Sequence, residues 1–254
     1  MRPESHPFIS SRSLATFARQ LGSHGVRVTL DPDGSAACYE DDGEVHPVKL
    51  VRGLADAAEG LGARIHEGTH VTAVRADSVT TAAGTVRAGA VVVCTNAYSD
   101  AVLPRARVVP IRAQMLATAP LERRLFPRPV YAHRGFRYWR QNADGRVLVG
   151  GWRNTALEEE TGTEARPTDA IQRHLDAFLA EHGVTAPVTH RWAGIMGFSH
   201  DSLPYIGRCS DGVYLHAGFT GHGNALAIAG GEIVASLIRN GRHPDADLFD
   251  PERA

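Results

Sequence analysis

Apolar residues recur at helical spacing over three segments of the chain. Residues 46–61 repeat apolar side chains every three or four positions, with Pro47 in the first turn, and residues 168–183 do the same behind a capping threonine. Residues 222–239 form a longer apolar stretch, and residues 13–21 also have helical spacing. We therefore predict helices over all four segments. The predicted buried face of the 168–183 helix contains Ile171, Leu175, Phe178 and Leu179.

Short β-rich segments separated by glycine, proline and polar turns fill most of the remainder. Strands are predicted over residues 26–30, 64–67, 71–75, 78–82, 85–87, 90–95 and 213–217. The run AVVVCT at 90–95 is apolar on both faces, which is typical of an interior parallel strand. An antiparallel sheet is predicted from residues 107–118, 130–132, 136–140, 146–150 and 188–195. The fold class is therefore mixed α/β. The antiparallel pattern between about residues 105 and 195 differs from the rest of the chain and indicates a second domain or a large insert.

Composition and charge exclude several classes of protein. The 254 residues suffice for one or two domains, and 27 Lys+Arg against 28 Asp+Glu exclude a basic surface for nucleic acid or anionic membrane. Cys38, Cys94 and Cys209 are odd in number and far apart, so they indicate neither a disulfide framework nor a zinc site, and the 13 His lack metal-ligand spacing. No leader pattern or membrane-length apolar run is present, and we predict a cytoplasmic protein.

Glycines surround the start of the last predicted helix. Gly218, Gly221 and Gly223 lie between a strand and a helix, whose free N–H groups and positive dipole end favour an anionic or electron-rich ligand. The spacing is G-x-x-G-x-G, which differs from the G-x-G-x-x-G of a dinucleotide-binding start and makes an NAD-linked dehydrogenase a weak alternative. A tight packing turn without a ligand stays open as the alternative interpretation.

Five stretches of the chain follow one another in an order typical of a known family. They are residues 46–74, VVVCTNAYSD (91–100), FRYWRQNADGRVLVGG (136–151), WAGIMGFSHDSLPYIG (192–207) and HAGFTGHGNALAIAGGEIVASLI (216–238). Together they resemble the FAD-dependent amine and amino-acid oxidoreductases of the D-amino-acid oxidase superfamily. Within it, the phrases VKLVRGLADAA, TNAYSD and YWRQNADGRVLVGG are most similar to gamma-glutamylputrescine oxidase-like enzymes.

The resemblance implies FAD as cofactor and a division into two domains. An FAD-binding, Rossmann-like domain would comprise residues 1–104 and 196–254, and an antiparallel substrate domain residues 105–195. Val71 would contact the adenine, Thr95 and Asn96 the pyrophosphate and ribose, and the segment from Asp201 to Gly207 the far side of the flavin. The implied contacts to the flavin ring are Gly218, Gly221, His222, Gly223 and Asn224.

Substrate contacts are implied at Tyr138, Arg140 and His222, which would touch an amine or amino-acid derivative whose hydride passes to flavin. Core packing for Tyr138, a surface ion pair for Arg140 and a simple helix-terminal hydrogen bond for His222 stay open as alternatives. Met196 occupies the position where glycine and D-amino-acid oxidases carry a carboxylate-binding arginine. This difference favours an amine or N-substituted amine over a free α-amino acid.

The family's G-x-G-x-x-G segment is absent from the 45 residues that precede the match. We therefore expect a C-terminal portion of an FAD-dependent oxidoreductase (EC 1.4 or 1.5 type), arising as a fragment, from a start site placed too late or by natural truncation. A homo-oligomer or a partner chain would then supply the missing FAD-binding segment. The alternative is a catalytically inactive truncated homologue that acts as an interaction module.

Overall fold

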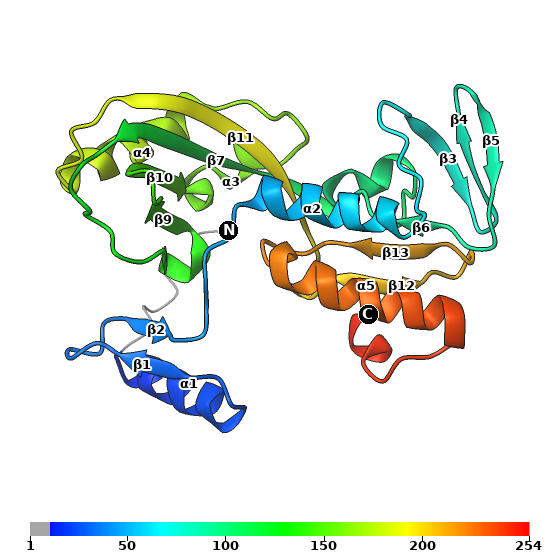
Figure 1. Ribbon diagram of the computed structural model, residues 1–254, viewed down its shortest axis with the longest axis horizontal. Helices are drawn as coiled ribbons and strands as arrows, with labels where there is room; N and C mark the ends of the chain where they lie inside the picture. Colours follow the sequence, from blue (N-terminus) through cyan, green and yellow to red (C-terminus); the bar gives the residue numbers. More distant parts are fainter. Residues whose placement is uncertain (1–10, 254) are drawn as a thin grey trace. The chain divides into compact units, whose positions relative to one another are not determined.

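The computed structural model describes residues 11–253 and divides the chain into two compact units, Met1–Ala63 and Arg64–Ala254. Residues 1–10, where the sequence shows no leader pattern, lie outside the described residues. Mixed α/β structure with antiparallel sheets runs through the second unit (Figure 1), which confirms the predicted fold class. Within the described range, no helix combines the length and the apolar character needed to cross a bilayer.

The first unit contains two helices and a two-stranded antiparallel ribbon. Its elements are α1 (Ser11–Ser23), β1 (Val28–Leu30), β2 (Ala37–Tyr39) and α2 (Pro47–Gly60). Helix α2 begins as its sequence predicts, because Pro47 occupies the first turn and His46 Nδ1 accepts a hydrogen bond from the Lys49 amide. Both predicted helices of this unit are confirmed, whereas β2 has no counterpart among the predicted strands.

A five-stranded antiparallel sheet dominates the second unit, in the order β11-β7-β10-β9-β8. Its strands are β7 (Val109–Pro120), β8 (Val130–Ala132), β9 (Arg137–Gln141), β10 (Arg146–Gly151) and β11 (Val188–Phe198). All five correspond to predicted strands. Strands β7 and β11 pair from Val188↔Thr118 to Phe198↔Val109, so β11 runs on past the length that the sequence predicted.

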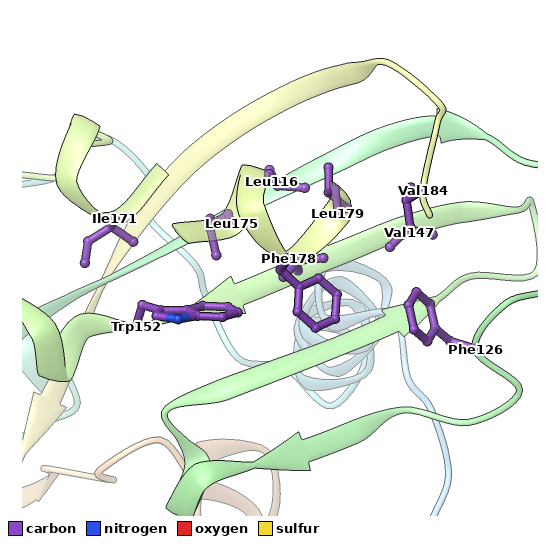
Figure 2. Close-up of a cluster of buried hydrophobic side chains, with 10 residues drawn as sticks. Leu116, Phe126, Val147, Trp152, Ile171, Leu175, Phe178, Leu179 and Val184 are labelled. Carbon is purple, nitrogen blue, oxygen red and sulfur yellow. The ribbon is translucent and has the colours of Figure 1, made fainter. Parts of the chain in front are cut away.

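Helix α4 (Asp169–Glu181) packs one face against this sheet (Figure 2). The predicted face is confirmed, because its four apolar residues are buried together with Leu116 of β7 and with Val147 and Val149 of β10. Thr168 occupies the N-cap position, as predicted, but its hydroxyl makes no cap hydrogen bond to the helix backbone. The Thr168 hydroxyl instead contacts the Gln114 and Glu160 side chains, inside a buried polar network.

That network attaches a short helix, α3 (Leu157–Glu160), to β7. The carboxylate of Glu160 is buried and accepts hydrogen bonds from Arg112 Nε at 3.1 Å and Nη2 at 2.9 Å, and from Gln114 Nε2 at 2.9 Å. Arg112 also donates to the backbone carbonyls of Glu159 and Glu164. Each charge of this buried pair therefore has several partners, which offsets the cost of removing it from water.

A second, three-stranded sheet has the order β12-β13-β6, with β13 antiparallel to β12 and parallel to β6. Helix α5 packs on it through Ile233 and Val234, which form a cluster with Ile206 of β12. A separate antiparallel meander has the order β3-β4-β5. The bounds are β3 (Val71–Arg75), β4 (Ser78–Thr81), β5 (Gly84–Arg87), β6 (Val92–Val93), β12 (Tyr205–Arg208), β13 (Tyr214–Ala217) and α5 (Gly223–Asn240).

Two strand predictions need correction. Residues 64–67 form no strand, because they pair with no neighbouring strand of the described structure and Ile65 is exposed. The strand predicted over 90–95 is reduced to β6, since Asn96 adopts a left-handed conformation and begins the short helix η1 (Asn96–Ala101). The parallel pairing of β6 is confirmed, but β6 lies at the edge of its sheet and not in its interior.

Candidate functional site

The predicted glycine segment joins β13 to α5, and we call residues Gly218–Asn224, the last two of which begin α5, the glycine loop. Three of its residues have positive φ: Gly218 at 77°, Thr220 at 51° and Gly221 at 87°. A side chain at Gly221 would meet no protein atom within 4 Å, so the backbone there faces open space. At Gly221 the loop therefore presents open backbone that a planar ligand can approach, whereas a side chain at Gly218 would lie 3.1 Å from Tyr205 Cδ2.

Hydrogen bonds hold the glycine loop to two distant segments. Asn96 Oδ1, at the start of η1, accepts a hydrogen bond from the Gly218 amide at 2.9 Å. The Thr220 amide donates to the carbonyl of Gly197 in β11 at 2.8 Å, and the Ser199 amide donates to Thr220 Oγ1 at 3.2 Å. The fold thus brings together Asn96, the end of β11 and the glycine loop.

The N-terminus of α5 is electrostatically open. His222 occupies the N-cap position without a side-chain cap hydrogen bond, and the first turn contains no acidic residue. The first N–H groups of this 18-residue helix therefore keep their positive partial charge. His222 is exposed, and its Nδ1 lies 3.1 Å from the Thr220 carbonyl oxygen, to which it donates, so Nε2 is left as the acceptor.

These features fit the flavin ring that the resemblance implies. An open backbone surface and uncapped N–H groups suit a planar ring that gains negative charge on reduction. The residues predicted to contact the flavin ring all lie in this loop, and Asn96 is hydrogen-bonded to it; they are Gly218, Gly221, His222, Gly223 and Asn224.

Other residues predicted for the cofactor share no hydrogen bond with the glycine loop within residues 11–253. Val71 begins β3 and pairs with Thr81, while Thr95 lies before η1 with its hydroxyl 3.2 Å from that of Ser99. Asp201 forms a two-pronged ion pair with Arg253, whose Nε and Nη2 each lie 2.8 Å from a carboxylate oxygen. This ion pair gives Asp201 a structural role.

The predicted substrate residues Tyr138 and Arg140 lie on β9. The Tyr138 ring stacks on Tyr131 at 6.4 Å between centroids and packs over Gly150 of β10. Burial raises the pKa of the Tyr138 phenol, and the positive charge of Arg153 opposes that shift. Arg140 is half-buried opposite Leu148. Tyr138 therefore lies beside a charged residue that the sequence analysis did not identify.

That residue is Arg153, which begins the short helix η3 (Arg153–Thr155) two residues after the end of β10. Its guanidinium lies over the Phe136 ring at 4.5 Å and the Phe198 ring at 5.4 Å, and Phe198 pairs with Phe219 of the glycine loop. We call Arg153, Phe136, Phe198 and Tyr138 the Arg153 cluster. A charged residue following Gly150-Gly151-Trp152 was the only sequence signal for it, and that signal does not distinguish a buried arginine from a surface one.

Two surface hollows lie away from these groups. One is lined by Ser236, Asn240, Arg242, His243 and Pro244 at the far end of α5, and the other by Leu121, Glu122, Arg124 and residues 141–145, near the turn between β9 and β10. Neither includes a residue of the glycine loop or the Arg153 cluster. The candidate site is described by its side-chain and backbone chemistry.

Comparison with known proteins identifies close relatives by sequence. The chain is 30% identical to the probable oxidoreductase OrdL of Rhizobium meliloti (strain 1021), over 96% of this chain and 56% of the relative. It is also 30% identical to the gamma-glutamylputrescine oxidoreductase of Escherichia coli (strain K12), over 91% of this chain and 55% of the relative. The chain thus spans about half the length of the curated relatives it matches.

The fold matches solved structures equally clearly. The L-proline dehydrogenase from P. horikoshii superposes with a TM-score of 0.81 at 23% identity, covering 95% of this chain and 73% of the dehydrogenase. At this identity the similarity establishes the fold alone. Residues 12–237 match the family described as FAD dependent oxidoreductase (DAO), which agrees with the resemblance found in the sequence. The chain belongs to this family of FAD-dependent oxidoreductases.

Proposed function

We propose that the chain carries the flavin-facing and substrate-facing parts of an enzyme that oxidises the C–N bond of an amine or amino-acid derivative. The observation that carries the proposal is the glycine loop, which joins an open backbone surface to an uncapped helix N-terminus in a chain of an FAD-dependent family. FAD, when bound, accepts the hydride from the carbon next to nitrogen.

The chain's own residues would position the reactants and stabilise charge. The free N–H groups of Gly223 and Asn224 at the start of α5 favour the negative charge that develops on the acceptor. His222 keeps its proton on Nδ1 through the Thr220 carbonyl, so Nε2 can accept a hydrogen bond from a substrate amine. Tyr138 and Arg140 are proposed as substrate contacts from β9.

The remaining cofactor contacts are proposals that rest on the family resemblance. Val71 would contact the adenine, and Thr95 and Asn96 would lie beside the pyrophosphate and ribose. Asn96 also accepts the hydrogen bond from the Gly218 amide. A division into an FAD-binding domain (1–104 and 196–254) and a substrate domain (105–195) stays a prediction. So do a cytoplasmic location, a homo-oligomer, and a partner chain that supplies further FAD contacts.

The substrate class is proposed from the relatives and the site together. The name of one relative includes gamma-glutamylputrescine, an amine that also carries a carboxylate. Met196 lies on β11 opposite Ile111, so this position offers no charge to a carboxylate. An N-substituted amine, oxidised in an EC 1.4 or 1.5 type of reaction, is the substrate we propose.

Flavin binding by the glycine loop is tested by a matched pair of glycine substitutions. Gly221 and Gly241 lie at opposite ends of α5, with φ of 87° and 72°, and a side chain at either would meet no protein atom within 4 Å. Alanine therefore imposes the same backbone strain, about 1 kcal/mol, at both positions. Equilibrium dialysis against FAD and riboflavin should show at least about tenfold weaker binding for Gly221→Ala and no change for Gly241→Ala.

The proposed function fails if the chain binds neither flavin, or if the two variants weaken binding equally. In the first case, the interaction-module alternative would be favoured. Once flavin is bound, an amine panel that includes gamma-glutamylputrescine, L-proline and glycine, assayed with oxygen and with an artificial electron acceptor, separates an oxidase from a dehydrogenase.

A further inference from the structure

The described structure buries two arginines, and only one of them has a carboxylate partner. Arg112 is 4% exposed and is paired with Glu160. Arg153 is 8% exposed, yet no carboxylate in residues 11–253 forms an ion pair or hydrogen bond with it. Arg112 is therefore neutralised by a carboxylate of the protein, whereas Arg153 has no counter-charge among the described residues.

Protein groups satisfy only a small part of the Arg153 side chain. One Nη1–H donates to the Gly135 carbonyl at 3.4 Å, a long hydrogen bond, and the rings of Phe136 and Phe198 lie against the guanidinium. An arginine has five N–H donors, and rings stacked on its face leave the donors at its edge available. Two side-chain atoms of the described structure are both sealed from solvent and without a hydrogen-bond partner, Trp139 Nε1 and His216 Nε2. No Arg153 nitrogen is among them, so the unused N–H donors of Arg153 stay accessible to a ligand.

The position of Arg153 points to the substrate. Phe198, which its guanidinium covers, is followed by Ser199 and pairs with Phe219 in the glycine loop. Tyr138, the tyrosine proposed as a substrate contact, lies close enough for its phenol pKa to respond to the charge of Arg153. The unpaired cation thus lies between the proposed substrate strand and the proposed flavin-facing loop.

We propose that Arg153 binds a carboxylate of the substrate, so that the enzyme selects amines that also carry an anionic group. This inference rests on the proposed function and deepens it by naming the substrate class. A buried cation without a partner is costly, and an arriving carboxylate offsets that cost with two parallel charge-assisted hydrogen bonds. Consistent with this, burial lowers the pKa of Arg153, whereas the hydrogen bonds of Arg112 to Glu160 raise the pKa of Arg112.

The first test measures stability without ligand, using Arg153→Met with Arg137→Met as the matched control. Arg137 also lies over an aromatic ring, that of Trp152 at 5.0 Å, and bonds to His133, but it is only half-buried. Because methionine removes an uncompensated buried charge, we expect Arg153→Met to unfold at the same or a higher temperature than the wild type. A clearly lower unfolding temperature for Arg153→Met alone would assign Arg153 to the core and overturn the proposal.

The second test measures binding of matched carboxylates and amides by NMR titration of the chain. The probes are N-acetylglycine against N-acetylglycinamide, and 5-aminopentanoate against 5-aminopentanamide. The wild type and Arg137→Met should bind at least one carboxylate about tenfold more tightly than its amide, and Arg153→Met should lose that preference. Arg153→Lys, which keeps the charge without the planar fork, should retain part of it.

No preference for either carboxylate in the wild type, or an equal loss in Arg137→Met and Arg153→Met, would overturn the inference. Its failure is distinguishable from failure of the proposed function, because the carboxylate titration needs no flavin and the flavin titration needs no carboxylate. Flavin binding without carboxylate preference would leave the proposed oxidoreductase and remove only the role of Arg153.

Discussion

At the scale of single residues, Thr220 shows how the site is held in shape. A β-branched residue disfavours positive φ, yet Thr220 adopts 51°. Three hydrogen bonds compensate: its amide donates to Gly197, and its hydroxyl accepts from the Ser199 amide and donates to the Gly218 carbonyl. Such strain, about 1–3 kcal/mol, persists only where neighbours enforce it, and the sequence marks the adjacent glycines but not this threonine.

Two adjacent glycines of α5 give opposite predictions. A side chain at Gly230 would lie 2.4 Å from His216 Nε2 and 2.7 Å from Ile206 Cδ1, whereas one at Gly231 meets no atom within 4 Å. We expect Gly230→Ala to lower the free energy of unfolding by about 1–3 kcal/mol through overpacking. Gly231→Ala should raise it by up to about 1 kcal/mol, because alanine favours a helix. Urea unfolding of both variants checks this, and equal shifts would contradict it.

At the scale of elements, the periodic helices could be predicted from sequence because their apolar spacing directly specifies a buried face. Helix α4 is the clearest case. Segments whose structure depends on a distant partner could not. Residues 64–67 contain a β-branched residue, Ile65, but pair with no strand in the described part of the chain, and β6 ends at Val93, shortly before Asn96 turns to accept a hydrogen bond from Gly218. The local sequence pattern cannot show either the missing strand partner or the distant hydrogen bond.

The candidate site divides in the same way. The glycine loop could be predicted because glycine spacing before a helix is a local signal. The role of Arg153 could not be predicted, since an arginine in a sequence does not reveal whether a carboxylate lies beside it in the fold. Thr220 and Ser199 likewise contribute through contacts between segments some 20 residues apart.

Glu160 is the buried side chain of the one-turn helix α3, and its carboxylate attaches the helix to Arg112 and Gln114 of β7. Glu160→Gln would leave Arg112 buried without its counter-charge, and we expect a loss of about 2–4 kcal/mol in the free energy of unfolding. Glu159→Gln in the same turn is the control, because that side chain is exposed and only its backbone carbonyl contacts Arg112. It should change stability by less than about 0.5 kcal/mol in the same urea titration.

At the scale of the whole molecule, the Asp201–Arg253 pair ties the C-terminal segment to the loop before β12. Arg253 also donates to the backbone carbonyls of Leu203 and Phe249, and its guanidinium lies 4.5 Å from the centre of the Tyr205 ring. Segments some 50 residues apart are thus joined around one guanidinium. This tie lies within the second unit, whose large sheet and small sheet have separate hydrophobic clusters.

The pair makes stability depend on pH. Arg253 holds the pKa of Asp201 well below its ordinary value of 3.8, so the unfolded chain takes up the proton at a higher pH than the folded one. The stabilisation is therefore complete above about pH 5 and declines as the pH falls through 3.8 toward the lowered pKa. Asp201→Asn should cost about 1–2 kcal/mol at neutral pH and progressively less below about pH 4.

Urea unfolding of the wild type and Asp201→Asn between neutral and acidic pH measures this difference. The control is Asp77→Asn, since Asp77 forms an exposed pair with Arg87 at 3.5 Å and should contribute little at any pH. A cost for Asp201→Asn that stays constant as the pH falls would contradict the assignment.

The two buried arginines also allow the contribution of a counter-ion to be measured by comparison within this one chain. Arg112 and Arg153 have the same guanidinium group at nearly the same depth, and they differ in whether a carboxylate faces them. Comparing Arg112→Met with Arg153→Met therefore measures, inside one fold and one solvent, how much a counter-ion contributes to sheltering a guanidinium from water. Few comparisons between different proteins can isolate that quantity, because there the surrounding fold changes along with the partner.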